Sequence, residues 1–324
     1  MLSRVAERIY WAGRYLERAE NTARLVNTYA NLLLDLPEET GVTWSQLLKI
    51  VALDDLYAER HRKAKEEKVL RFLLVDERNP GSILSSLREA RENVRTTRDV
   101  VPTEVWESVN EFYLMGQHQL ARAVARRRRF EVLSDCVTRS QQITGLLSGT
   151  MSHDQAYQFL RLGNHIERAD MTTRVVDAGA ATLAYGKKSI LHYENTLWMT
   201  VLRALSGYQM YRRHVRRRIR GQDVIEFLLT DAEFPRSVMH ALNAIEGYSA
   251  TLPHREPTHD VLHRLRSGLE GGRATADEGE SLRRYVDDLQ RGFAEVHRTI
   301  EATWFRHGDE EEASSEASTS PDPR

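Results

Sequence analysis

The spacing of apolar residues near the start of the chain predicts one long amphipathic helix. Apolar side chains recur every three or four positions and fall on a single stripe. They are Leu2, Val5, Ile9, Ala12, Leu16, Ala19, Ala23, Val26 and Ala30. The pattern ends at Leu36-Pro37, because proline cannot continue a helix. Similar spacing recurs at residues 83–94 and 160–176, whereas sustained period-two alternation is hard to find, so the chain is predicted to be all-α.

The chain also matches itself at an offset of about 150 residues, which indicates an internal duplication. Residues 9–26 (IYWAGRYLERAENTARLV) align with residues 159–176 (FLRLGNHIERADMTTRVV). Residues 72–83 (FLLVDERNPGSI) align with residues 227–238 (FLLTDAEFPRSV). Between these segments, Trp44, Leu48 and Tyr57 lie over Trp198, Leu202 and Tyr211. Because the three matches keep the same order, we expect two related helical halves that pack as one helical bundle with pseudo-two-fold symmetry.

Composition divides the chain into a folded domain and a tail. No spacer rich in Pro, Gly or Ser separates the halves between 130 and 160. We therefore expect a single helical domain over residues 1–307, with repeat halves at approximately 1–130 and 151–300. Residues 308–324 (GDEEEASSEASTSPDPR) have no large apolar side chain and are rich in Glu and Ser. They are predicted to form a disordered acidic tail.

Charge and cysteine content exclude several classes of protein. The chain of 324 residues contains 46 Lys and Arg against 47 Asp and Glu, a balance that argues against a general polyanion binder. The acidic tail leaves the rest of the chain with a net positive charge, carried mostly by Arg. The one cysteine, Cys136, cannot form an internal disulfide framework or a cysteine-ligated zinc site. The N-terminus lacks the apolar region of a signal peptide and no stretch is apolar enough to span a membrane, so we expect a cytoplasmic protein.

The repeated long helix carries the residues most suited to chemistry. In each half a glycine, two acids and an arginine fall on one narrow stripe beside the apolar face, at positions i, i+4, i+7 and i+11. They are Gly13, Glu17, Glu20 and Arg24 in the first half, and Gly163, Glu167, Asp170 and Arg174 in the second. Glycine allows another backbone to approach closely, and a buried carboxylate needs a partner. Arg18 and Arg168 point away from the stripe, toward neighbouring helices or the other half.

Three interpretations of this stripe are open. The first is a set of salt bridges that fix how the two long helices cross. The second is a polar cavity between the halves, in which four carboxylates and four guanidiniums hold an amino acid, a peptide terminus or a phosphorylated intermediate. The third is a carboxylate-bridged metal centre. On the second interpretation the candidate catalytic residues are Glu17, Arg18, Glu167 and Arg168, and the candidate substrate-binding residues are Glu20, Arg24, Asp170 and Arg174.

Metal and cofactor chemistry has little support in the sequence. A di-metal site in a helical bundle uses Glu-x-x-His on two helices, and neither repeated motif supplies the histidine. His153 and His165 lie near the second motif, but we expect them at the surface or in helix caps. The chain contains no Walker A loop, no GxGxxG after a strand, no HExxH and no nucleophile elbow. These absences disfavour a self-contained ATP-using or hydrolytic enzyme, and no metal ligand or cofactor is predicted.

Two runs of arginine resemble phosphate-binding surfaces. One lies at 126–129 and the other at 212–220. A basic helix face is usually only solvated, and the chain shows neither a DNA-binding motif nor aromatic residues interleaved with the arginines. Nucleic acid is therefore disfavoured as a partner.

Four segments together resemble the bacterial alpha-E domain family, named for a helical domain with Glu-Arg motifs. They are MLSRVAERIYWAGRYLERAENTARL, NPGSILSSLREARENVRTTRD, FLRLGNHIERADMTTRV and VIEFLLTDAEFPRSV. The resemblance covers the chain from residue 1 to about residue 305 and maps the family's characteristic residues onto Glu17, Arg18, Glu167 and Arg168. It implies an all-helical protein encoded beside a circularly permuted ATP-grasp protein and a transglutaminase-like cysteine peptidase, with a role in making or processing amide-linked peptides.

Residues and resemblance together suggest three functions. The first is an accessory or substrate-binding component of an ATP-grasp-dependent system that forms amide or peptide bonds, with a Glu/Arg-lined site for a peptide or amino acid. The second is an enzyme in its own right that uses a motif glutamate as an acid or base. The third is a purely structural scaffold for protein–protein interaction. They differ in whether the two Glu-Arg helices face a shared, solvent-reachable cavity.

Overall fold

The computed structural model describes residues 1–271 and 280–305 of the chain, and these residues form fourteen α-helices, short 3-10 turns and no β-strand. The helices are α1 (Ser3–Asp35), α2 (Trp44–Ile50), α3 (Asp54–Ala58), α4 (Glu66–Leu74), α5 (Ile83–Arg95), α6 (Thr103–Gln119), α7 (Arg126–Thr150), α8 (Gln155–Tyr185), α9 (Glu194–Ala204), α10 (Tyr208–Val215), α11 (Gly221–Thr230), α12 (Val238–Ser249), α13 (Glu256–Gly271) and α14 (Glu280–Ile300). A π-helical turn, Glu301–Phe305, continues α14. The predicted all-α class is confirmed, whereas the acidic tail predicted at 308–324 lies outside the described residues.

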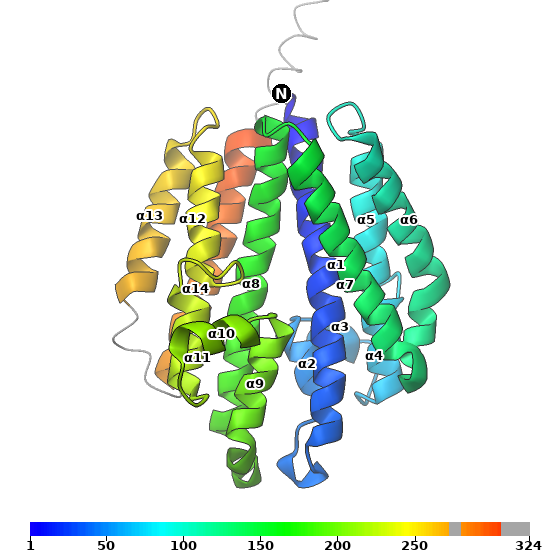
Figure 1. Ribbon diagram of the computed structural model, residues 1–324, viewed down its shortest axis with the longest axis vertical. Helices are drawn as coiled ribbons and strands as arrows, with labels where there is room; N and C mark the ends of the chain where they lie inside the picture. The colour runs from blue at the N-terminus through cyan, green and yellow to red at the C-terminus, as the bar shows by residue number, and fades with distance from the viewer. Residues whose placement is uncertain (272–279, 306–324) are drawn as a thin grey trace, which may run out of the picture.

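Two long helices, α1 and α8, run side by side through the middle of the molecule (Figure 1). α5 and α7 pack against α1 with α6 outside them, and α12 and α14 pack against α8 with α13 outside them. The shorter helices α2–α4 and α9–α11 gather toward one end. Buried apolar side chains from all of these groups form one continuous core. None of the described helices combines the length and the apolar character needed to span a membrane.

Local signals in the sequence account for the limits of the two central helices. α1 ends directly before Leu36-Pro37, as predicted. α8 begins after Asp154, whose side chain accepts hydrogen bonds from the backbone N–H groups of Ala156 and Tyr157 at 2.9 and 3.3 Å. These bonds satisfy two of the donors that a helix N-terminus leaves without partners.

The two aligned F-L-L-x-D segments make the same kind of turn before a helix. Ser82 and Ser237 cap α5 and α12, because each hydroxyl accepts a hydrogen bond from the backbone N–H three residues later, at 3.1 and 3.0 Å. In the preceding turns, Asp76 and Asp231 each accept a hydrogen bond from the backbone N–H two residues later, at 2.9 Å. The turn before α12 also places Arg236 inside the molecule, where it is 9% exposed.

α1 and α8 touch at a pair of glycines. A Cβ atom on Gly13 would lie 2.2 Å from the carbonyl oxygen of Leu160, and one on Gly163 would lie 2.1 Å from the carbonyl oxygen of Tyr10. The side chain of Asn164 donates a hydrogen bond to the Gly13 carbonyl at 3.0 Å. The two backbones are therefore in direct contact, which is the role that the sequence predicted for both glycines.

Replacing either glycine with alanine is expected to destabilise the fold. Gly13→Ala and Gly163→Ala each force a methyl group against a backbone carbonyl that cannot rotate away, so we expect a loss of at least about 2 kcal/mol in the free energy of unfolding. Gly145→Ala is the matched control, because a Cβ there meets nothing within 4 Å. It should raise the free energy of unfolding by up to about 1 kcal/mol. If Gly13→Ala, Gly163→Ala and Gly145→Ala changed the free energy of urea unfolding equally, the helices would not touch at the two glycines.

Candidate functional site

The two Glu-Arg motifs bind each other across the glycine contact. Arg168 donates to both carboxylate oxygens of Glu17, at 2.9 and 2.7 Å. Arg18 donates to both carboxylate oxygens of Glu167, at 2.6 and 2.9 Å. Both glutamates are buried, with 2% and 4% of their surface exposed. Each bidentate pair uses the planar fork of arginine, and the two pairs join α1 to α8 about one helical turn beyond the glycine contact.

A second guanidinium binds each motif glutamate. Arg14 donates to Glu167 at 2.9 Å, and Arg236 donates to Glu17 at 3.1 Å. Neither arginine was predicted from the sequence to belong to the site. Arg14 had a weak signal, since it lies one helical turn before the motif arginine of α1. Arg236 had none, because Gly81 occupies its place in the aligned segment of the first half.

Arg236 also gathers the polar residues of α1 that follow the motif. It donates to Glu20 at 2.7 Å and to the side-chain oxygen of Asn21 at 2.7 Å. Arg24 donates to Glu20 at 2.8 Å and to the hydroxyl of Ser206, between α9 and α10, at 2.6 Å. The Arg236 cluster is the resulting set of Glu17, Glu20, Asn21, Arg24, Arg168 and Arg236.

The eight residues predicted from the sequence lie in three sets rather than one. Four of them, Glu17, Glu20, Arg24 and Arg168, belong to the Arg236 cluster. Arg18 and Glu167 form the Glu167 cluster with Arg14. Asp170 and Arg174 pair with each other along α8 at 2.8 Å, with about a quarter of each side chain exposed. No hydrogen bond between these side chains joins one set to another, so the eight side chains do not form a single hydrogen-bonded network.

The bound guanidiniums keep both motif glutamates ionised. Burial acts to raise the pKa of Glu17 and of Glu167, but the two arginines bound to each outweigh it and lower both pKa values to about 2. A general base works best when its pKa lies near the working pH. The motif glutamates are therefore suited to holding two helices together and poorly suited to accepting a proton at neutral pH.

Two histidines beside these clusters are held neutral. Burial, together with Arg168 and Arg161, lowers the pKa of His165 well below its usual range. Burial, followed by the charge of Arg14, lowers the pKa of His297 to about 4. His165 is only 2% exposed, so its expected place at the surface or in a cap was wrong, whereas His153 is exposed and contacts the Ser148 carbonyl near the end of α7.

The described residues offer no obvious metal or thiol site. No three His, Cys, Asp or Glu side chains in residues 1–271 and 280–305 converge as a possible ligand set. Guanidiniums already occupy the motif carboxylates, which is unfavourable for a carboxylate-bridged metal. Cys136 is buried, and burial raises the pKa of its thiol to about 12, so it is not an activated nucleophile.

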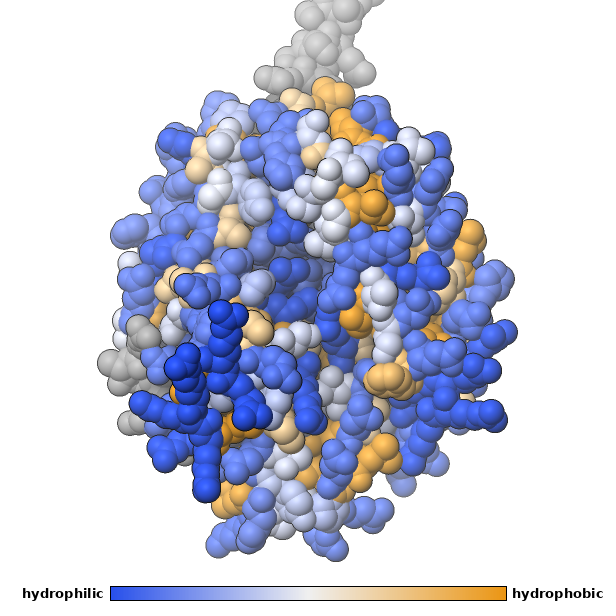
Figure 2. Space-filling view, in the orientation of Figure 1, coloured by the Kyte–Doolittle hydropathy of each residue, from blue (hydrophilic) through white to orange (hydrophobic). Residues whose placement is uncertain are grey.

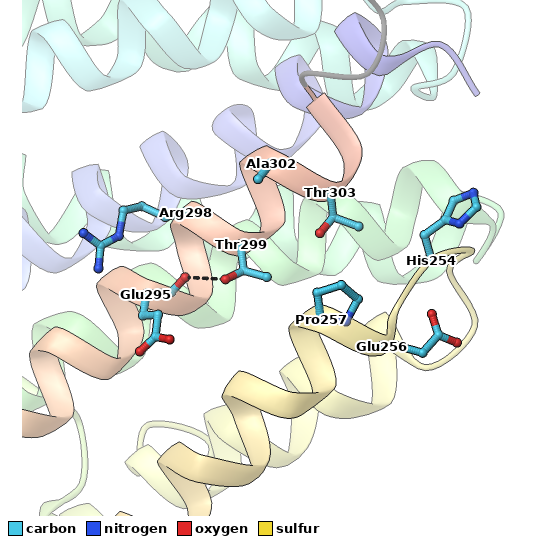
Figure 3. A pocket seen from close by; sticks show the side chains of 8 residues that line it. All are labelled: His254, Glu256, Pro257, Glu295, Arg298, Thr299, Ala302 and Thr303. Carbon is cyan, nitrogen blue, oxygen red and sulfur yellow. Dashed lines mark hydrogen bonds between the residues drawn. The ribbon is translucent and has the colours of Figure 1, made fainter.

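Two cavities of about 710 Å³ lie away from the glycine contact. Figure 3 shows the first, between the start of α13 and the end of α14; His254, Glu256, Pro257 and side chains of α14 line it. The second lies between α8, α14 and the segment that joins α1 to α2, and Arg174 lines it. Of the eight residues predicted from the sequence, Arg174 is the one that reaches either cavity.

A double-mutant cycle measures how strongly the motifs are coupled. Glu17→Gln leaves two buried guanidiniums without their carboxylate, so we expect a loss of about 3–5 kcal/mol in the free energy of unfolding. Arg168→Gln should cost a similar amount, and the double variant should cost less than the sum. Glu67→Gln is the control, since Glu67 and Arg71 form an exposed pair that should contribute no more than about 1 kcal/mol. Additive single losses would rule out the coupling.

Stability should fall in two stages as the pH is lowered. Because the pKa of His297 is about 4 in the folded protein and 6.5 as a free side chain, the unfolded chain binds the proton first. The free energy of unfolding should decrease between these values by up to about 1.4 kcal/mol per pH unit for each buried histidine. The motif glutamates cause the second stage, because their pKa is 4.5 as free side chains and about 2 in the folded protein, so the unfolded chain again binds protons first. In urea unfolding across this pH range, the free energy of unfolding should fall less in the first stage for His297→Gln than for the control His254→Gln.

The comparisons with known proteins agree with this geometry. A model of the Alpha-E family, described as a predicted alpha-helical domain with a conserved ER motif, matches residues 1–305. Uncharacterized proteins of Mycobacterium bovis and of Mycobacterium tuberculosis are each 26% identical over 272 residues. The match covers 77% of this chain but 30% of each relative, so the chain spans less than a third of their length. No solved structure shows significant similarity. With the family model matched over nearly its whole length, the chain belongs to the Alpha-E family.

Proposed function

We propose that this protein is a cytoplasmic accessory component of an ATP-grasp-dependent system that forms amide or peptide bonds, and that it works by binding its partner protein. The observation that carries the proposal is the full pairing of both motif glutamates by guanidiniums. Such pairing suits a rigid helical component and argues against a glutamate base. A circularly permuted ATP-grasp protein would activate a carboxylate as an acyl phosphate, and a transglutaminase-like peptidase is the second proposed partner.

The length of the relatives supports action beside another protein. The region similar to this chain makes up 30% of each mycobacterial relative, so in those proteins it is covalently attached to other sequence. A helical domain that is part of a longer polypeptide in its relatives is well suited to working beside a separate partner.

We also propose that the two halves arose by duplication and pack about a pseudo-two-fold axis. Support comes from residues that have equivalent partners in the two halves. They are Gly13 and Gly163, Glu17 and Glu167, Arg18 and Arg168, Asp76 and Asp231, and Ser82 and Ser237.

An unneutralised arginine segment supports an acidic partner surface. In the first arginine run, Glu66 binds Arg126 and Arg129, and Glu131 binds Arg128. The second run has no acidic partner for its arginines among the described residues. This arginine segment consists of Arg212, Arg213, Arg216, Arg217, Arg218 and Arg220, all exposed. Figure 2 shows strongly hydrophilic side chains over α10 and α11, on a face that is hollowed between α8 and α7.

Co-purification tests the partnership directly. The chain and the neighbouring ATP-grasp protein should form a complex that weakens with salt, and Arg216→Glu, Arg217→Glu and Arg218→Glu together should weaken it by at least about tenfold. The control changes Arg122, Arg127 and Arg128 to Glu, which alters charge equally at exposed sites elsewhere. Absence of a complex at micromolar concentration, with or without ATP, would refute the proposal.

A further inference from the structure

The α8–α14 cavity is the second cavity described above, and its lining is polar and charged. It lies between α8, α14, α2 and the segment that joins α1 to α2, with a volume of about 710 Å³. Three of its cations, Lys49, Lys187 and Arg283, come from three different parts of the chain. The charged residues that line it are Lys49, Asp54, Arg174, Asp177, Lys187 and Arg283.

Asp177 lines the cavity, and one of its carboxylate oxygens, Oδ1, is buried and has no hydrogen-bond partner among the described residues. Burial raises the pKa of Asp177, Arg283 acts to lower it, and Asp287 acts to raise it. A buried polar atom without a partner is unfavourable. An ammonium group placed in the cavity would stabilise the charge of the Asp177 carboxylate.

The cavity also contains cations that have no acidic partner in the described part of the chain, so a ligand with a negative group could bind them. Arg174 is already bound to Asp170, whereas Lys49, Lys187 and Arg283 have no acidic partner among the described residues. The guanidinium of Arg283 lies over the ring of Tyr185, 6.0 Å from its centroid, and affects the pKa of Asp177 without forming an ion pair with it. The cavity therefore offers unpaired positive charge and one unpaired carboxylate, on side chains that come from α2, α8, α14 and the segment after α8.

The position of Lys187 is set by a glycine. Gly41 has a φ of +74°, and a Cβ there would lie 3.2 Å from Cε of Lys187. The lysine stem thus packs over the backbone between α1 and α2, and both Gly41 and Lys187 line the cavity.

The cavity in Figure 3 has a similar volume but no carboxylate with a buried, unpartnered oxygen. Glu256 and Glu295 both line it; Glu295 is bound by Arg264 at 2.6 Å, and the Thr299 hydroxyl donates to the Glu295 carbonyl at 3.0 Å. None of the residues that line it carries a buried polar atom without a partner.

We propose that the α8–α14 cavity binds an amino acid or the end of a short peptide, with the ligand amine on Asp177 and a ligand carboxylate on Arg283 and the two lysines. The proposal deepens the proposed function and rests on it in one respect, because a system that forms amide bonds handles ligands of this class. The pairing of the ligand's amine and carboxylate with the charged residues of the cavity does not require a partner protein.

Ligand binding to the purified chain tests the proposal. The probes are the twenty amino acids and a set of alanyl dipeptides, measured by saturation-transfer NMR and then by titration calorimetry. The best binder is compared with its N-acetylated form, which lacks the amine, and its amidated form, which lacks the carboxylate. Each modification should weaken binding by at least about tenfold.

Matched variants assign the two ends of the ligand. Asp177→Asn should weaken binding of the unmodified ligand by at least about tenfold and leave the affinity of the N-acetylated form unchanged. Arg283→Gln should weaken the free ligand and leave the affinity of the amidated form unchanged. Arg284→Gln is the control, because Arg284 is the next residue on α14, binds Glu280 at 2.6 Å and does not line the cavity. Melting temperatures should stay similar, so a loss of binding cannot be attributed to unfolding.

Two results would overturn the proposal. One is the absence of saturable binding by any probe. The other is equal binding by Asp177→Asn and Arg284→Gln, which would leave at most an anion site. Because the experiment uses the chain alone, failure of the partner complex would not affect its result, and binding of a probe would not rescue a failed complex.

Discussion

The fold depends on four oppositely charged side chains that bind one another around a contact between two backbones. Glu17 and Arg168, and Glu167 with Arg18, span from one central helix to the other only because the helices touch at Gly13 and Gly163. Burying an ionised carboxylate is unfavourable unless it is paired and hydrogen-bonded. A shift of α8 by one turn along α1 would separate both pairs at once. The close approach and the register of the two helices are therefore specified together.

Both motif carboxylates are fully paired, and the guanidiniums that bind them outnumber them. Each motif glutamate binds two arginines, so the centre of the molecule carries surplus positive charge. That surplus adds to burial in keeping His165 and His297 neutral. A ligand needs groups whose pairing is incomplete, and the α8–α14 cavity supplies them, because Asp177 and three nearby cations form no ion pair with one another. The residues of the family's ER motif and the residues proposed to bind a ligand are thus different sets.

The features that could be predicted from the sequence are those that depend on local periodicity or on a single residue type. The helical class, the end of α1 before Leu36-Pro37 and the role of Gly13 all follow from spacing or from properties of one residue type. The direction of Arg168, away from the stripe and toward the other half, also follows from helix geometry and is confirmed by its bond to Glu17.

Contacts between residues far apart in the chain were not predictable. Arg236 reaches Glu17 across 219 positions, and nothing in the aligned segments marks it, since Gly81 is its counterpart. The burial of His165 depends on how α12 packs against α8, which period alone does not specify. The cavity around Asp177 is formed by segments from both ends of the chain. Its existence depends on tertiary packing rather than on any motif.

The glycine contact also fixes the distance between the two central helices, because no side chain separates their backbones there. Buried side chains and ion pairs along both helices hold the angle at which they cross. Asp177 lies ten residues beyond Glu167 on α8, which is about 15 Å along the helix axis. Any rotation of α8 about the glycine contact would therefore displace Asp177, and the ion pairs of Glu167 and Arg168 are among the contacts that oppose it.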